Sequence, residues 1–152
     1  MCSPKRISDS RTTHVEILMP ADLNGYNRLF GGRLMQWIEG VVARRHSGCE
    51  VTTASVDQLE FQAPAFVNDT IAMEGRITHV GRTSMEVRVD TFVESLGGER
   101  RQVNRAYLVM VALDPKTHKP TPVPSLLLET EEDFAEWEAG NLRAKARKAR
   151  RS

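Results

Sequence analysis

The sequence has few cysteines and no long apolar run. Its two cysteines, Cys2 and Cys49, are too few for a disulfide scaffold. No stretch approaches the roughly 18 apolar residues of a membrane span, and the N-terminus lacks the apolar core of a secretory signal. We therefore expect a cytoplasmic protein with free thiols and no membrane partner. The sequence also lacks an excess of charge of either sign. It has 21 Lys and Arg against 20 Asp and Glu, and the net charge of +1 argues against a nucleic-acid partner.

The composition is that of an ordinary globular protein. Hydrophobic residues make up 40% and charged residues 27% of the 152 residues, which is enough for a single core. We expect one domain over residues 1–128, with a loose N-terminus over about 1–11, and a further segment over 129–152. That segment carries acids at its start and bases at its end, which suits the dipole of a helix. Two interpretations stay open for it: a solvated terminal helix, or a tail that binds a polyanion.

Hydrophobic periodicity divides the rest of the chain into one long helix and five strands. Apolar residues recur at helical spacing over 33–46, and β-branched or alternating stretches between Pro and Gly turns predict the strands. The strands are expected at residues 14–19, 51–61, 70–80, 84–93 and 103–113. This order predicts an α+β fold in which the helix packs on an antiparallel sheet of about five strands. A second copy, paired across a twofold axis, would bury the edge strand and the open face.

Gly31, Gly32 and Glu39 are the first candidates for chemistry. The two glycines open the predicted helix, where unpaired N–H groups bind an anion or the oxyanion of acyl transfer. Glu39 is the single carboxylate within 33–46, and it follows Gly32 by about two turns, or roughly 10 Å. It is therefore too far along to act on a substrate at its own helix start, but it suits one held by an antiparallel neighbouring helix. A simple Gly-Gly turn and a surface glutamate are the alternative interpretations.

Four segments carry a family pattern in the right order: Asn24–Glu39, Ala43–Gly48, Val51–Asp57 and Val80–Val87. Together they resemble the hotdog-fold acyl-CoA thioesterases, and most closely the bacterial short-chain thioesterases and the brain-type acyl-CoA hydrolases. The resemblance extends over about residues 12–114. It implies a long central helix wrapped by a curved antiparallel sheet, and homodimers or trimers of dimers. It also implies hydrolysis of acyl-CoA to acid and free CoA at sites between subunits, without a metal or another cofactor.

The resemblance assigns catalytic roles to four residues. Asn24 matches an asparagine that helps to place the water or the carbonyl group. Gly31 and Gly32 match the glycines whose amides bind the oxyanion. Glu39 matches the helix carboxylate, which acts from the other subunit as general base or as nucleophile.

Recognition of coenzyme A is expected from Arg82 and Ser84 in a hairpin and from Arg44 and Arg45 at the helix end. Guanidinium groups bind phosphate in a bidentate manner, which suits the phosphates of coenzyme A. An exposed turn arginine and cations that complement the helix dipole are the alternative interpretations. Asp57 resembles a frequent family acid, with capping or pairing to an arginine as the alternative.

Three departures from the family pattern lead to a second hypothesis. Glu39 stands where Asp is commoner, Asn27 stands where Gly is usual, and the segment from Glu39 to Arg44 is about three residues short. One extra methylene moves a carboxylate by about an ångström, and such a shift can lower a rate roughly 10²-fold. The alternative function is therefore a catalytically impaired hotdog protein that binds acyl-CoA as a sensor or interaction module. A third hypothesis is a polyanion-binding protein that uses residues 143–152.

Overall fold

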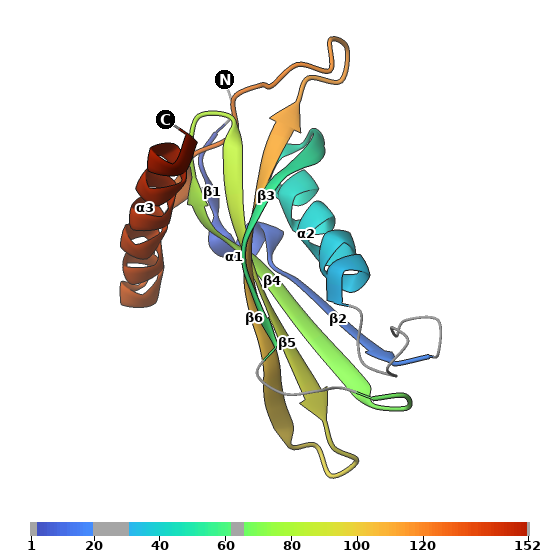
Figure 1. Cartoon of the computed structure of the whole chain (residues 1–152). Coiled ribbons are helices and arrows are strands. Elements are labelled where there is room, and N and C mark those ends of the chain that lie inside the picture. The colour runs from blue at the N-terminus through green and yellow to red at the C-terminus, as the bar shows by residue number, and fades with distance from the viewer. Residues whose placement is uncertain (1–2, 20–30, 62–65, 152) are drawn as a thin grey trace.

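Five antiparallel strands form one curved sheet in the computed structural model (Figure 1). The structure describes residues 3–19, 31–61 and 66–151, with the backbone alone at 31–36, 57–61 and 151. The predicted strands are confirmed; one has the predicted bounds, and the ends of the others differ by one to three residues. In the order β2-β4-β5-β6-β3, their bounds are β2 (Thr12–Ile17), β4 (Thr70–Val80), β5 (Ser84–Glu94), β6 (Arg100–Leu113) and β3 (Glu50–Phe61).

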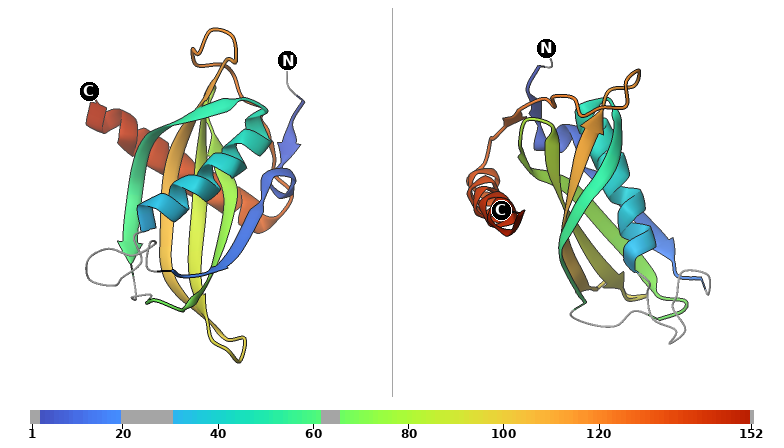
Figure 2. Two further views of the ribbon diagram at one scale, coloured as in Figure 1. Left: turned by 90° about the vertical axis from the view of Figure 1, so that its right-hand side faces the viewer. Right: turned by 45° about the horizontal axis from the view of Figure 1, so that its top comes forward.

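The helix α2 (Gly31–Ser47) lies against one face of the sheet, which curls around it (Figure 2). It extends the predicted helix by two residues at its start and one at its end. Ile38 and Val42 are fully buried and pack against β4 at Gly75, where a Cβ would lie 2.9 Å from Val42 Cγ2. A glycine therefore lets the helix and the strand approach closely. The long helix on an antiparallel sheet confirms the expected α+β arrangement.

The helix α3 (Glu131–Arg151) covers the opposite face of the sheet (Figures 1 and 2). It is the expected terminal helix, but one of its sides is docked rather than solvated. Gly140 packs against His79 of β4, the Trp137 ring lies 4.3 Å from the His79 ring, and His79 Nε2 donates to Asn141 Oδ1 at 2.7 Å. Within the residues that the structure describes, no helix is both long and apolar enough to cross a membrane.

Charged side chains also join α3 to the sheet. Glu86 of β5 is 1% exposed and accepts hydrogen bonds from Arg143 at 2.7 and 2.9 Å. Arg147 lies 3.5 Å from the same carboxylate. Two bases of the C-terminal segment are thus held by the sheet, and this observation weighs against the hypothesis of a polyanion-binding tail.

Residues 5–10, which we expected to be loose, form a short strand and a helical turn. The strand β1 (Lys5–Arg6) pairs in parallel with β7 (Leu126–Leu127). The strand β7 follows a segment that contains Pro120, Pro122 and Pro124, and it was not predicted. The turn α1 (Ile7–Ser10) packs against α2, and its two end residues are buried. The N-terminal segment is therefore part of the packed structure from residue 5 onward.

Candidate active site

Glu39 is a fully buried carboxylate in the middle of α2. Its side chain is 0% exposed, and its Oε1 accepts a hydrogen bond from the Thr53 hydroxyl at 3.3 Å. Its Oε2 has no hydrogen-bond partner in the part of the chain that the structure describes. Burial raises the pKa of Glu39 from 4.5 to about 7, although the Thr53 hydrogen bond lowers it. Such a carboxylate can take up and release a proton near neutral pH.

Thr53 is a site residue that the sequence analysis missed. It lies on β3, at the edge of the sheet, and its hydroxyl points to α2. The register between β3 and β6 shifts directly after it, between Thr53 and Ser55. Such bulges re-aim side chains beside active sites. The family-like segment that contains Thr53 was the available signal, but only Asp57 was singled out within it; the side chain of Asp57 is not among those described.

The predicted oxyanion amides lie at the start of α2. The helix begins at Gly31, which confirms that Gly31 and Gly32 form its first turn. The rise of an α-helix separates this turn from Glu39 by roughly 10 Å, so one chain does not bring the amides and the carboxylate together. Asn24 lies outside the residues that the structure describes.

The predicted coenzyme A ligands gather near one end of the sheet, where α2 ends and β4 turns into β5. Arg82 is exposed and Ser84 is half-buried in the hairpin between β4 and β5. Arg44 is exposed and lines a surface pocket of about 380 Å³. The Arg45 guanidinium instead donates to Thr12 Oγ1 at 3.1 Å, which favours a structural role. Glu39 lies at mid-helix, away from these four residues.

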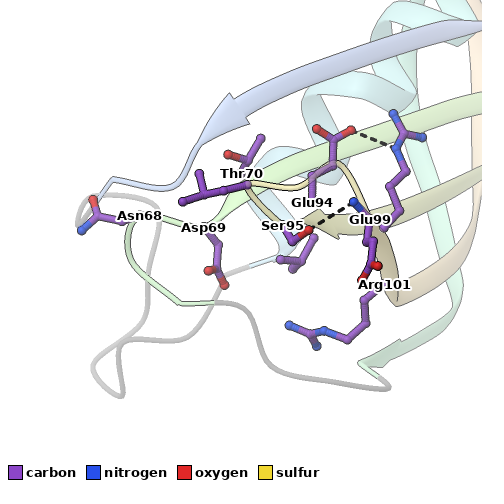
Figure 3. Close-up of a pocket in the computed structure, with 10 residues that line it drawn as sticks. Asn68, Asp69, Thr70, Glu94, Ser95, Glu99 and Arg101 are labelled. Carbon is purple, nitrogen blue, oxygen red and sulfur yellow. Dashed lines mark hydrogen bonds and ion pairs between the residues drawn. The ribbon is translucent and has the colours of Figure 1, made fainter.

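A second pocket, of about 540 Å³, lies between the start of β4 and the hairpin of β5 and β6 (Figure 3). In its wall Arg100 Nε donates to Glu94 Oε1 at 2.9 Å, and the amide of Glu99 donates to Ser95 Oγ at 3.1 Å. The pocket contains none of the predicted site residues. Because it contains none of them and these wall residues bond to one another, we do not assign it to catalysis.

His46 is another buried titratable residue, and its contacts serve the fold. It lies in the last turn of α2, is 0% exposed, and donates from Nε2 to the carbonyl of Pro124 at 2.7 Å. Burial lowers the pKa of His46 below 6.5. Among the described residues no group of three His, Cys, Asp or Glu side chains could hold a metal ion. The chemistry of the described residues therefore centres on Glu39.

Comparison with known proteins gives the family. The family model of the thioesterase superfamily matches residues 26–98. An acyl-CoA thioester hydrolase of Bacillus subtilis, itself uncharacterized, is 38% identical over 147 residues, which cover 94% of this chain and 85% of that protein. The chain belongs to the thioesterase superfamily. A cytosolic acyl coenzyme A thioester hydrolase of Rattus norvegicus is 32% identical over 97% of this chain, which spans only 40% of the length of that relative.

Solved structures of acyl-CoA thioesterases share the fold. An apo-hexameric acyl-CoA thioesterase has a TM-score of 0.88 at 36% identity, with 98% of each chain covered. The acyl-CoA hydrolase of Staphylococcus aureus, in complex with butyryl coenzyme A, has a TM-score of 0.87 at 30% identity, with 97% of this chain and 93% of that one covered. Variants of the S. aureus enzyme with an aspartate, a threonine or an asparagine changed to alanine have similar structures. The expected hotdog fold is thereby confirmed.

Proposed function

We propose that the protein is an acyl-CoA thioesterase in which Glu39 is the general base. The observation that carries this proposal is a buried carboxylate on the central helix of a member of the thioesterase superfamily. One of its oxygens is held by Thr53, and the other has no partner among the described residues. A pKa of about 7 suits a group that takes and returns a proton at neutral pH.

The proposed reaction is a general-base hydrolysis. Glu39 removes a proton from water, and the resulting hydroxide attacks the thioester carbonyl carbon. The oxyanion that forms accepts hydrogen bonds from the first-turn amides of Gly31 and Gly32. When this intermediate collapses, the carbon–sulfur bond breaks, and Glu39 returns the proton to the sulfur of coenzyme A. The products are the free acid and coenzyme A.

We propose that two copies of the chain share this site. The first-turn amides of α2 and Glu39 are roughly 10 Å apart along the helix, which is too far for both to act on one carbonyl group. The edge strand β3 carries Thr53, and pairing of β3 with a twofold-related copy would bring a second α2 alongside. The hexameric relative supports a homodimer or a trimer of dimers.

The substituted residues of the S. aureus enzyme support these roles. Asn24, Glu39 and Thr53 follow the same order as the asparagine, aspartate and threonine of that enzyme, and fifteen positions separate the first two residues in both chains. The interval from Glu39 to Thr53 is three residues shorter than its counterpart. Thr53 nevertheless contacts Glu39 at 3.3 Å. The short segment thus keeps the pair together, which favours an active site over an impaired one.

Coenzyme A is proposed to bind through Arg82 and Ser84, with Arg44 as a further phosphate ligand. Arg82 and Arg44 are exposed and form no ion pair with the described residues, so their guanidinium groups suit phosphate. Arg45 is a weaker candidate because its guanidinium is bonded to Thr12. The substrate is therefore expected to lie with its nucleotide part near the end of α2.

Release of free thiol from butyryl-CoA tests the proposed activity. Wild-type protein should release coenzyme A, and Glu39→Gln should lose roughly 10²- to 10⁴-fold in kcat while it still binds coenzyme A. Wild-type kcat in the variant would refute the role of Glu39. Coenzyme A binding without any thiol release by the wild type, across short and long acyl chains, would instead support the sensor hypothesis.

A mixing experiment tests the shared site. Neither Glu39→Gln nor Asn24→Ala should be active alone, but a hybrid dimer of the two keeps one intact site. Mixed and re-equilibrated subunits should therefore regain part of the activity. If the mixture stays as inactive as its components although hybrids form, the site does not combine these residues from different chains.

A further inference from the structure

The Thr53 hydroxyl lies between two acceptors. Its Oγ1 is 3.3 Å from Glu39 Oε1 and 3.5 Å from Met110 Sδ. A hydroxyl group carries a single proton, so Thr53 cannot donate to the carboxylate and to the sulfur at the same time. An ionised carboxylate is a stronger acceptor than a thioether sulfur, so ionisation of Glu39 favours donation to Oε1.

The fold holds this arrangement in place. Thr53 of β3 and Met110 of β6 are directly opposite each other in the sheet, so their side chains share the face that contacts α2. Met110 is 4% exposed and belongs to the hydrophobic core. Its neighbour on the other side is Met85 of β5, in register with it. A thioether sulfur is a weak acceptor, and because Thr53 is exposed in the single chain, water is the acceptor that competes with it for the hydroxyl proton.

No described charged group is among the causes of the raised pKa of Glu39, which are burial and the Thr53 hydrogen bond. On β2, His14 stacks on Trp37 and lies 3.1 Å from Glu16. On the N-terminal segment, Lys5 and Asp9 act on His46. The strands β4, β5 and β6 face α2 with the apolar side chains of the core. The described surroundings of Glu39 therefore leave Thr53 as the group that discriminates between its two protonation states.

We propose that Met110 is a positioning residue for the general base, because its sulfur accepts the Thr53 hydroxyl proton whenever Glu39 is protonated. In the ionised state Thr53 Oγ1–H donates to Glu39 Oε1. In the protonated resting state the proton sits on Oε1, since Oε2 has no acceptor among the described residues. Oε1–H then donates to Thr53 Oγ1, and Oγ1–H turns to Met110 Sδ. Only the proton on Glu39 is gained or lost, and the threonine hydroxyl rotates.

This inference rests on the proposed function, because it assigns Met110 to the site of the proposed base. It explains how one threonine can satisfy the carboxylate in both states that a general base must adopt. Without the sulfur, the Thr53 hydroxyl proton of the protonated state would have no acceptor among the described residues and would turn to water. Without the hydroxyl, the ionised state would lose its described donor. The two residues therefore act on the protonation of Glu39 in opposite directions.

The test compares four variants. Thr53→Val removes the donor to the carboxylate and should raise the pKa of Glu39 by about one unit. Met110→Leu removes the sulfur at similar volume and should lower it by about half a unit, as expected for a weak hydrogen bond. Met85→Leu is the matched control for repacking of the core and should leave the pKa of Glu39 unchanged. In the double variant Thr53→Val/Met110→Leu, the second change should add nothing to the first.

Two readouts separate this inference from the proposed function. The first is the acid limb of the pH profile of kcat/KM with butyryl-CoA. The second needs no activity: the pH dependence of the free energy of unfolding relative to Glu39→Gln in the same background gives the pKa of Glu39 by linkage. The proposal is supported if, in both readouts, Thr53→Val raises the pKa of Glu39 and Met110→Leu lowers it. A shift in the second readout without hydrolysis would refute only the proposed function, whereas an unchanged or raised pKa in Met110→Leu would overturn the role of Met110.

Discussion

Replacement of Glu39 by glutamine should stabilise the fold at neutral and alkaline pH while it removes activity. The side chain is fully buried, and burial raises the pKa from 4.5 to about 7. A group that binds its proton more tightly in the folded state makes the free energy of unfolding fall as the pH rises between the two pKa values. Glutamine has a similar size and does not ionise, so the variant escapes this loss.

The magnitude follows from the interval between the two pKa values. An interval from 4.5 to about 7 corresponds to about 3 kcal/mol, at roughly 1.4 kcal/mol per unit. Below pH 4.5 Glu39 is protonated in both the folded and the unfolded state, so the two proteins should be about equally stable. Above pH 8 the variant should be more stable by up to that amount. Full burial of the side chain means that screening by solvent does not reduce the expected difference.

Urea unfolding followed by tryptophan fluorescence measures this difference across pH 4 to 9. Trp37 on α2 and Trp137 on α3 report from the two faces of the sheet. The protein concentration must be held constant, because subunit assembly adds to the apparent stability. Glu138→Gln, at an exposed position on α3, is the matched control and should show no pH-dependent gain. Parallel stability curves for Glu39→Gln and wild type would refute the argument that burial governs this carboxylate.

Three further perturbations test other parts of the structure. Gly140→Ala should lower the free energy of unfolding by about 1–3 kcal/mol, because the added Cβ would lie 2.6 Å from His79 Cβ; an equal or higher stability in urea would show that α3 adapts. The wild type should lose thermal stability as the pH falls below 6.5, because the lowered pKa of His46 means that the unfolded state binds the proton more tightly. In His46→Gln this loss should be smaller. An equal loss of melting temperature at acid pH in both proteins would contradict this. Arg82→Ala should raise the KM for butyryl-CoA roughly tenfold or more, with a smaller change in kcat, and an unchanged KM at moderate salt would make Arg82 structural.

The sheet and the central helix were predictable because their signals are local. Alternating or β-branched stretches between Pro and Gly turns located every strand of the sheet, and helical spacing located α2. The strands β1 and β7 were missed because each has only two residues and exists through pairing with the other, far along the chain. Such pairing leaves no periodic pattern in the sequence.

Burial of the outer face was not predictable from alternation. Glu86, Arg88 and Asp90 alternate with valines on β5, a pattern typical of a half-exposed strand. They are only 1%, 8% and 5% exposed. The helix α3 supplies Arg143 to Glu86 and Glu136 to Arg88, whereas Asp90 pairs with Arg88 and Arg105 of the sheet. The sequence of a charged terminal helix predicts that its side chains are exposed to solvent. Only the ion pairs in the folded structure show which of them face the sheet. The same limit hid Thr53, which lies directly before a register shift in β3 and contacts Glu39 across the sheet and helix.

Two buried glutamates on opposite faces of one sheet show why Glu39 is the candidate base. Burial raises the pKa of both, but Glu86 also receives hydrogen bonds from Arg143 and Thr78 that hold its pKa below the usual 4.5. It stays ionised and ties α3 to β5. Among the described residues Glu39 has a single neutral donor, Thr53, so burial prevails and the pKa rises to about 7. A carboxylate that is fully paired with cations cannot exchange a proton at neutral pH, whereas a buried one without a charged partner can. This difference in partners separates the structural glutamate from the proposed base.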